Sequence, residues 1–213
     1  MRRGKLPVSE VGRGAAGAAA TALTRRQWLT RVLLVGALVW ARRATAEEPR
    51  VPPRLQAELL AKVAAYDGHF PARAAGRALV LVLVAPKEPD SERFGAQIRA
   101  ELAKQPLIGG VEHMEEIVRY SSAAELTRLC RERKAAVVYI GPGLSAEATA
   151  IADALAGIDV LSVAAVSADV TRGIVLGFEV ISGKPKLSIH LTRARRQNVA
   201  FKPELLRLAR VLQ

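Results

Sequence analysis

Few residues of this 213-residue chain could carry out catalysis. Nucleophilic hydrolysis needs a serine or cysteine beside a base that a third group orients. The imidazole of such a base could come only from His69, His113 or His190, and no Gly-x-Ser-x-Gly elbow is present. The sequence therefore predicts no catalytic residues and favours a protein that is not an enzyme.

One short segment could bind a metal. His113-Met114-Glu115-Glu116 places an imidazole and two carboxylates together, but a metal site needs three or four ligands that converge in space. No second cluster of histidine or cysteine accompanies this segment in the sequence. We therefore interpret it as a solvated charged loop and predict neither a metal nor a cofactor.

Gly141-Pro142-Gly143 lies between a predicted strand and a predicted helix, where backbone N–H groups could bind an anion. It lacks the spacing of Gly-x-Gly-x-x-Gly and the lysine of a phosphate-binding loop, which favours a plain turn. Ala85-Pro86-Lys87 also follows a predicted parallel strand, and open α/β sheets bind ligands at this edge. An unidentified small ligand at these two loops is therefore an alternative function.

The chain has one cysteine, Cys130, so it cannot form a disulfide within itself. Cys130 shares one face of a predicted helix with Ala123 and Leu126. This pattern favours a buried, small apolar side chain, and a reactive redox thiol is the alternative.

The positive charge of the chain is concentrated near its beginning. Of the formal net charge of +12, residues 1–46 contribute nine Lys or Arg against one acidic residue. Residues 47–213 hold 23 basic and 19 acidic residues and are close to balanced. Because the rest of the chain lacks a strong basic excess, we predict that nucleic acid is not a partner.

Residues 1–46 have the three parts of a cleavable export signal. A basic start is followed by an apolar run over residues 32–41 and by small residues at Ala44 and Ala46. The apolar run would form a helix of about 15 Å, too short for a hydrocarbon core of roughly 30 Å. We predict cleavage after Ala46 and a mature protein in the periplasm.

A twin-arginine pattern indicates the route of export. Arg25 and Arg26 precede the aromatic Trp28 and the aliphatic Leu29. A signal for the general secretion route with incidental arginines is the alternative. Both routes export the protein.

The sequence predicts that the mature chain consists of a short tether over residues 47–53 and one domain over residues 54–213. The domain begins with a predicted helix that ends near Gly68. Predicted strands then alternate with helices, with Asp90 or Ser91 as the N-cap of the first of these helices and Ser121 or Ser122 as the cap of the second. The strands are predicted over residues 78–84, 116–120, 135–140 and 160–164. This order predicts an α/β fold, a mostly parallel sheet flanked by helices in a three-layer sandwich.

The last part of the chain has a different pattern. Residues 174–181 and 186–191 alternate between apolar and polar side chains about a turn, which predicts a C-terminal antiparallel β-hairpin. Pairing Ile181 with Lys186 would place Glu179 opposite Ser188 and turn one polar face outward. A closing helix is predicted from the spacing of Leu205, Leu208 and Leu212.

The hairpin and the residues that follow it are the predicted partner-binding surface. Glu179, Lys186 and His190 lie on or beside the outward face, and His190 could respond to periplasmic pH. Arg193, Arg195 and Arg196 follow and could contact an acidic partner or lipid headgroups. An ordinary solvated face is the alternative interpretation.

The closing segment resembles the end of the YfiR-like family of exported bacterial proteins. The resemblance is carried by Gly173 to Phe178, by Gly183 to Leu191, and by the run from Ala194 through Ala200-Phe201-Lys202-Pro203 to Val211. An aromatic-proline pair before the first strand, here Phe70-Pro71, also resembles the opening of the family, so the likeness covers about residues 54–212. It implies a periplasmic regulator without known catalysis.

The resemblance further implies the partner and the output. Characterised members bind the periplasmic sensor domain of an inner-membrane diguanylate cyclase and hold it inactive, which lowers cyclic di-GMP signalling and biofilm formation. Related domains occur beside histidine kinases. We therefore predict a membrane-bound sensor enzyme, a cyclase or a histidine kinase, as the partner, and leave a homodimer open.

Two departures from the family pattern bear on this prediction. The best-known members carry disulfides that tune repression, which Cys130 alone cannot form. The family's usual tryptophan before proline is here Phe70, which we include among the partner-binding residues.

Overall fold

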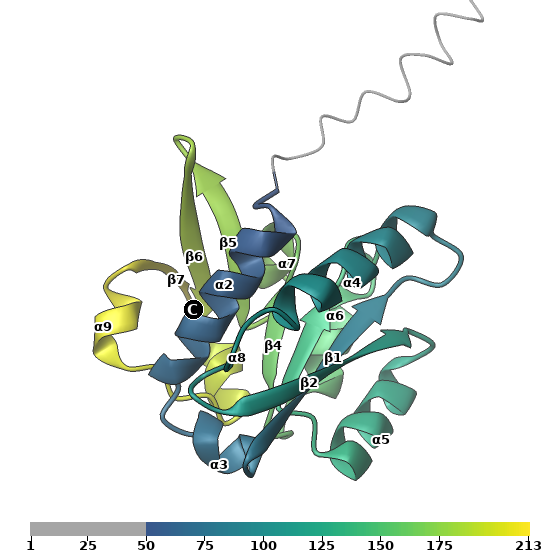
Figure 1. The fold of residues 1–213 in the computed structure, drawn as a ribbon, viewed down its shortest axis with the longest axis horizontal. Coiled ribbons are helices and arrows are strands. Elements are labelled where there is room, and N and C mark those ends of the chain that lie inside the picture. Colours follow the sequence, from purple (N-terminus) through teal and green to yellow (C-terminus); the bar gives the residue numbers. More distant parts are fainter. Residues whose placement is uncertain (1–49) are drawn as a thin grey trace, which may run out of the picture. The chain divides into compact units, whose positions relative to one another are not determined.

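Seven strands form one sheet in the computed structural model, which describes residues 50–213 (Figure 1). Their order across the sheet is β2-β1-β3-β4-β5-β6-β7. All neighbours are parallel except β5 and β6, which form the predicted antiparallel hairpin. The strands are β1 (Arg77–Val84), β2 (Glu112–Arg119), β3 (Val137–Ile140), β4 (Leu161–Ala164), β5 (Leu176–Ile181), β6 (Lys184–His190) and β7 (Ala209–Leu212).

Helices cover both faces of the sheet and enclose two apolar cores. Alternate residues of β1 belong to different cores: Val80 and Val82 pack into one, Leu79, Leu81 and Leu83 into the other. The first core is covered by α2 (Pro53–Val63) and α4 (Pro89–Leu102), the second by α5 (Ala123–Arg133), α6 (Ala148–Ala154) and α7 (Ala168–Thr171). The predicted three-layer α/β architecture is confirmed. The remaining helices are η1 (Ala64–Tyr66), α3 (Phe70–Ala74), α8 (Leu191–Arg196) and α9 (Pro203–Leu206).

The predicted N-cap is confirmed for one helix and wrong for another. Ser122 caps α5 as predicted, because its hydroxyl oxygen accepts the Glu125 N–H at 3.2 Å. Ser91 does not cap α4, which begins at Pro89 without a side-chain cap. The Ser91 hydroxyl oxygen instead accepts the Ala85 N–H at 2.8 Å and so joins α4 to the end of β1.

The segment His113-Met114-Glu115-Glu116 is part of β2, so the prediction of a solvated loop is wrong. His113 lies 2.9 Å from the carbonyl oxygen of Gln105 through Nε2 and contacts the Glu115 carboxylate through Nδ1. The parallel pairing of β2 with β1 along its whole length explains the difference, since the polar side chains of an edge strand hide its strand pattern.

The prediction of a closing helix is also wrong. Only Pro203–Leu206 is helical, and Ala209–Leu212 forms β7 beside β6. The hairpin register differs as well, because Ile181 pairs with Lys184 and Glu179 with Lys186. The observed register is shifted by two residues from the predicted one, so each side chain stays on its predicted face of the hairpin but is opposite a different residue.

The predicted tether is partly inside the domain. Val51 is 1% exposed and its carbonyl oxygen accepts a hydrogen bond from the Gln56 side chain at 2.6 Å. The export-signal residues Arg25, Arg26, Trp28, Leu29, Ala44 and Ala46 lie outside the described residues. Across residues 50–213, the structure contains no helix with the length and apolar character needed to span a membrane.

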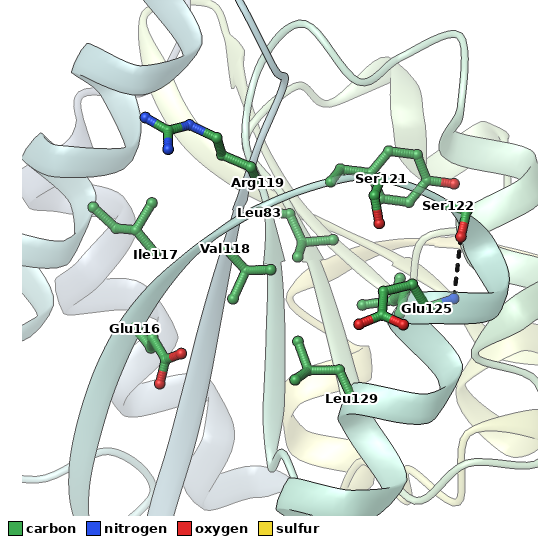
Figure 2. A pocket seen from close by; sticks show the side chains of 11 residues that line it. Leu83, Glu116, Ile117, Val118, Arg119, Ser121, Ser122, Glu125 and Leu129 are labelled. Carbon is green, nitrogen blue, oxygen red and sulfur yellow. Dashed lines mark hydrogen bonds between the residues drawn. The ribbon is translucent and has the colours of Figure 1, made fainter.

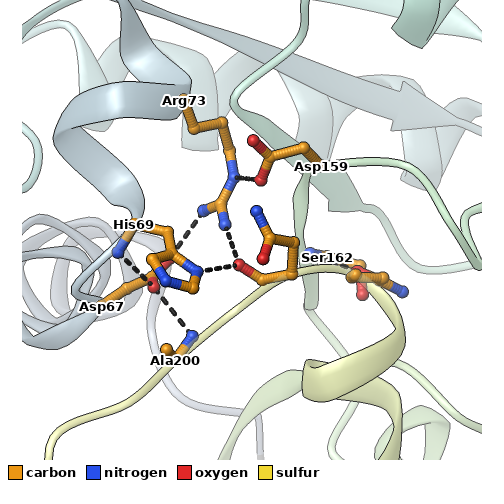
Figure 3. Close-up of polar contacts among 8 residues, drawn as sticks. Asp67, His69, Arg73, Asp159, Ser162 and Ala200 are labelled. Atoms are coloured by element: carbon orange, nitrogen blue, oxygen red, sulfur yellow. Dashed lines mark hydrogen bonds and ion pairs between the residues drawn. The ribbon is translucent and has the colours of Figure 1, made fainter.

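A buried polar cluster joins the first part of the domain to its last part (Figure 3). Arg73 pairs with Asp67 at 2.6 Å and with Asp159 at 2.7 Å, and donates to the carbonyl oxygen of Asn198 at 2.9 Å. Asp67 accepts the backbone N–H of Ala200 at 2.9 Å. The segments that carry the opening and closing parts of the family pattern therefore contact each other directly.

Candidate protein-binding surface

The hairpin and β7 bring three charged side chains together on one face of the sheet. Glu179 pairs with Lys186 across the hairpin, and Ser188 is beside Arg210 in β7. The Glu179 carboxylate accepts a hydrogen bond from the Ser188 hydroxyl at 2.7 Å and lies 3.4 Å from the Arg210 guanidinium. Arg210 was missed in the sequence because the Leu spacing of residues 205–212 indicated a helix.

This face is exposed only toward the hairpin tip. Ile181 is 44% exposed, and Lys184 and Lys186 are also exposed. Toward the other end, Ser188 is buried and Gly177 lies so close to α7 that a Cβ there would be 2.4 Å from Val170. The predicted outward polar face is therefore correct for the outer half of the hairpin and wrong for the inner half.

We define the β5–β7 surface as Glu179, Ile181, Lys184, Lys186 and Arg210. In Figure 1 the β5–β6 hairpin extends beyond the neighbouring strands, so the tip is accessible. Leu208, 71% exposed, adds apolar area immediately before β7, whereas Val211 is in register with the core residue Ile189 and lies on the other face of the sheet. An exposed apolar area rimmed by charged side chains can mark a site of contact with another protein.

His190 is not part of the exposed surface. It ends β6, and its Nδ1 atom is buried without a hydrogen-bond partner among residues 50–213. Burial lowers the pKa of His190, and the nearby charges of Arg193 and Arg196 lower it further. The imidazole is therefore neutral at neutral pH.

The three basic residues of α8 have two different environments. Arg193 pairs with Asp153 of α6 at 2.6 Å, and its side chain is 17% exposed. Arg195 and Arg196 are exposed and have no ion pair within the described part of the chain. Arg193 thus holds α8 against α6, while Arg195 and Arg196 lie at the end of β6 that is away from the hairpin tip.

Phe70 does not contact solvent, so its prediction as a partner-binding residue is wrong. Its side chain is 0% exposed at the start of α3. The ring packs against Gly109, whose φ is +60° and where a Cβ would lie 2.5 Å from the Phe70 ring. Phe70 is a core residue.

Two hollows lie at the carboxyl ends of β1, β2 and β3. The loops after β1 and β3, each considered in the sequence as a ligand-binding edge, meet at a cavity of about 490 Å³. A second hollow of about 290 Å³ lies between β2 and α5 and shares Tyr120, Ser121 and Ser122 with the first (Figure 2). Within residues 50–213, no three or more His, Cys, Asp or Glu side chains are placed to hold a metal.

Comparison with protein families identifies the domain. The family model described as YfiR/HmsC-like matches residues 53–210. The chain belongs to the YfiR/HmsC-like family. Members of the YfiR/HmsC-like family are regulatory, non-catalytic proteins of the periplasm. Comparison with curated proteins gave no match.

Solved structures with a similar fold include a conserved domain protein from Vibrio cholerae, with 14% identity over 78% of this chain and 61% of that one and a TM-score of 0.53. Another is an ABC domain from Streptococcus pneumoniae in complex with L-Trp, with 12% identity over 76% and 62% and a TM-score of 0.54. A third is CD0873, a substrate-binding protein from Clostridium difficile, with 11% identity over 73% and 58% and a TM-score of 0.53. The chain spans less than two thirds of each of these proteins, and the likeness extends to the fold alone.

Proposed function

We propose that this protein is an exported repressor that binds the periplasmic sensor domain of an inner-membrane diguanylate cyclase or histidine kinase. Membership of the YfiR/HmsC-like family supports the general class of periplasmic regulator. Residues 1–46 would be the cleaved export signal, of twin-arginine type and cut after Ala46, with residues 47–53 leading into the domain. With a cyclase as partner, binding would lower cyclic di-GMP and biofilm formation.

The single observation that supports contact with a protein is the β5–β7 surface. It combines the exposed Ile181 with Lys184, Lys186 and Arg210 at a projecting hairpin. Lys184 and Lys186 have no ion pair among residues 50–213, so they are available to carboxylates of a partner.

Repression would follow from unequal affinity for two states of the sensor. A protein that binds the inactive state more tightly shifts the sensor toward that state by the ratio of its two affinities. Shifting a population from about 1:99 to 99:1 requires a ratio of roughly 10⁴. No bond is made or broken in this scheme.

The test measures binding of the purified protein to membranes that contain the full-length sensor enzyme. We expect the Lys186→Ala/Arg210→Ala double variant to bind at least about tenfold more weakly, a loss of about 1.4 kcal/mol. The matched control is Lys62→Ala/Arg99→Ala, which removes the same charge from exposed, unpaired residues of α2 and α4 on the opposite face of the sheet. Equal affinities for the two double variants would exclude the β5–β7 surface, and membranes that retain no protein would exclude the function.

A second function, the binding of a small ligand, is favoured by the cavity at the ends of β1 and β3. Two of the proteins with a similar fold are described as a complex with L-Trp and as a substrate-binding protein. A thermal-shift screen tests this function, because a ligand that binds only the folded state raises the Tm, by an amount that grows with the logarithm of its concentration above the Kd. A screen of amines, amino acids, sugars and carboxylates in which no compound raises the Tm would exclude it.

A further inference from the structure

The cavity of about 490 Å³ lies where the connections of the sheet diverge. From β1 the chain passes through α4 on one face of the sheet to β2, and from β3 through α6 on the other face to β4. Because β1 and β3 are neighbours in the sheet, the loops that follow them leave toward opposite faces, and the cavity lies between these two loops. Ligands of open α/β sheets bind in this position.

The charged residues that line this cavity are all negative. They are Glu88, in the loop after β1, and Glu147, immediately before α6. Neither carboxylate has an ion pair or a hydrogen bond within residues 50–213. The neighbouring acidic residues Glu92, Glu116 and Glu125 differ, because each is paired with an arginine.

Tyr120 supplies an unpaired polar atom in the same cavity. The residue is 9% exposed, lines both hollows, and its hydroxyl has no hydrogen-bond partner in the described part of the chain. Burial and the negative charge of Glu147 raise the pKa of Tyr120, so the phenol stays protonated. The Tyr120 side chain is thus largely buried, and its hydroxyl, which is not among the buried atoms without a partner, remains open to the cavity and available to a ligand.

The backbone at Gly143 is shaped around one of the carboxylates. Gly143 has φ of +87°, and a Cβ there would lie 2.6 Å from the Glu88 carboxylate. A larger residue at this position would displace the flexible Glu88 side chain, so the glycine leaves room for the carboxylate beside the loop. The glycine loop, interpreted from the sequence as a plain turn, thus borders a negative charge at the cavity.

We infer that this cavity binds a small organic ammonium ion. The inference rests on the second function above and names its class of ligand. The carboxylates of Glu88 and Glu147 would attract the cation, and the Tyr120 ring and hydroxyl would contact it. An organic cation fits better than Ca²⁺, which takes about six to eight oxygen ligands. The cavity volume lies within the range of small-molecule sites, about 300–1,000 Å³.

Isothermal titration calorimetry of the full chain with 1,4-diaminobutane tests the inference, with 1,4-butanediol as the neutral analogue of equal length. We expect saturable binding of the diamine and none of the diol. Equal binding of both, or no binding of the diamine, would overturn the inference. If the thermal-shift screen then finds an uncharged or anionic ligand, the general ligand-binding function survives without it.

Variants locate the site. We expect Glu88→Gln/Glu147→Gln to weaken diamine binding at least about tenfold, because two charge-assisted contacts are lost. The matched control is Glu112→Gln/Glu204→Gln, which removes two exposed, unpaired carboxylates elsewhere and should change the affinity less than about twofold. Tyr120→Phe removes only the hydroxyl and should weaken binding about threefold. Equal losses in the two double variants would show non-specific charge attraction and overturn the assignment.

Discussion

Asp67 and Arg73 form an ion pair of 2.6 Å whose side chains are 0% and 2% exposed. The pair is satisfied by groups distant in the sequence, because Asp67 also accepts the Ala200 N–H and Arg73 also donates to the Asn198 carbonyl oxygen (Figure 3). Such contacts compensate the cost of removing two charges from water. The ion pair is therefore stable only when the C-terminal segment is in place. The ion pair in turn holds that segment against the first part of the domain.

Arg73→Met should lower the free energy of unfolding by about 3–5 kcal/mol, because it leaves the Asp67 carboxylate buried and without its counter-charge. Urea denaturation followed by circular dichroism measures the change. Arg54→Met is the control, since Arg54 forms an exposed pair with Glu58 and should cost less than about 1 kcal/mol. Similar losses in the two variants would contradict the central role of the buried pair.

Cys130 should resist alkylation in the folded protein. Burial raises the pKa of Cys130 to about 12, so almost no thiolate is present at pH 8. We expect iodoacetamide to label the protein only after denaturant unfolds it. Rapid labelling without denaturant would instead support the redox thiol considered in the sequence.

Because of Cys130, the free energy of unfolding should depend on pH in the alkaline range. Because its pKa is raised in the folded state, the folded protein retains a proton that the unfolded chain loses above about pH 8.5. The free energy of unfolding should therefore fall as pH rises from about 9 toward 12. Cys130→Ala should show a smaller fall than the unmodified protein, measured by urea denaturation across this range, and parallel curves would contradict the linkage.

Gly141→Ala should destabilise the protein. A Cβ at this position would lie 2.7 Å from the carbonyl oxygen of Leu83, a backbone atom that cannot move aside without disturbing β1. We expect a loss of about 1–3 kcal/mol in urea denaturation. Gly68→Ala is the control, because its Cβ would meet the Ala200 carbonyl oxygen at an ordinary 3.7 Å. An equally large loss in Gly68→Ala would show that replacing any glycine lowers the stability, whether or not the new Cβ contacts a backbone atom.

His190 should titrate below its ordinary pKa of 6.5, since burial and the charges of Arg193 and Arg196 disfavour its protonated form. Its depressed folded pKa means that the unfolded state binds the proton more readily, so stability decreases as pH falls below about 6.5. Arg196→Gln should raise the pKa of His190 in an NMR titration. Arg207→Gln, which removes an exposed charge from another segment, should leave it unchanged. An unaltered titration in Arg196→Gln would exclude the charge effect.

The layered α/β fold was predictable because its central strands are apolar without interruption. Residues 78–84 have no polar side chain, so only a strand covered on both faces fits them. Ser122 was predictable as a cap for an equally local reason, because it needs only the Glu125 N–H.

The strands at the two edges of the sheet were harder to predict. Ala209–Leu212 is short, follows leucines at helical spacing, and becomes a strand through its pairing with β6. Arg210 could not be assigned to the β5–β7 surface without that pairing. Phe70 was misplaced for a related reason, because an aromatic residue before proline gives no indication of whether its side chain faces the core.

The contact between Asp67 and Ala200 also limits how this protein can fold. The two residues are 133 positions apart, so most of the domain must be ordered before their hydrogen bond can form. Contacts of such long sequence separation slow folding. While the chain is still being synthesised, Asp67 and Arg73 lack the hydrogen-bond donor and acceptor that residues 198–200 provide. The buried pair can therefore be completed only after the C-terminal segment has been made.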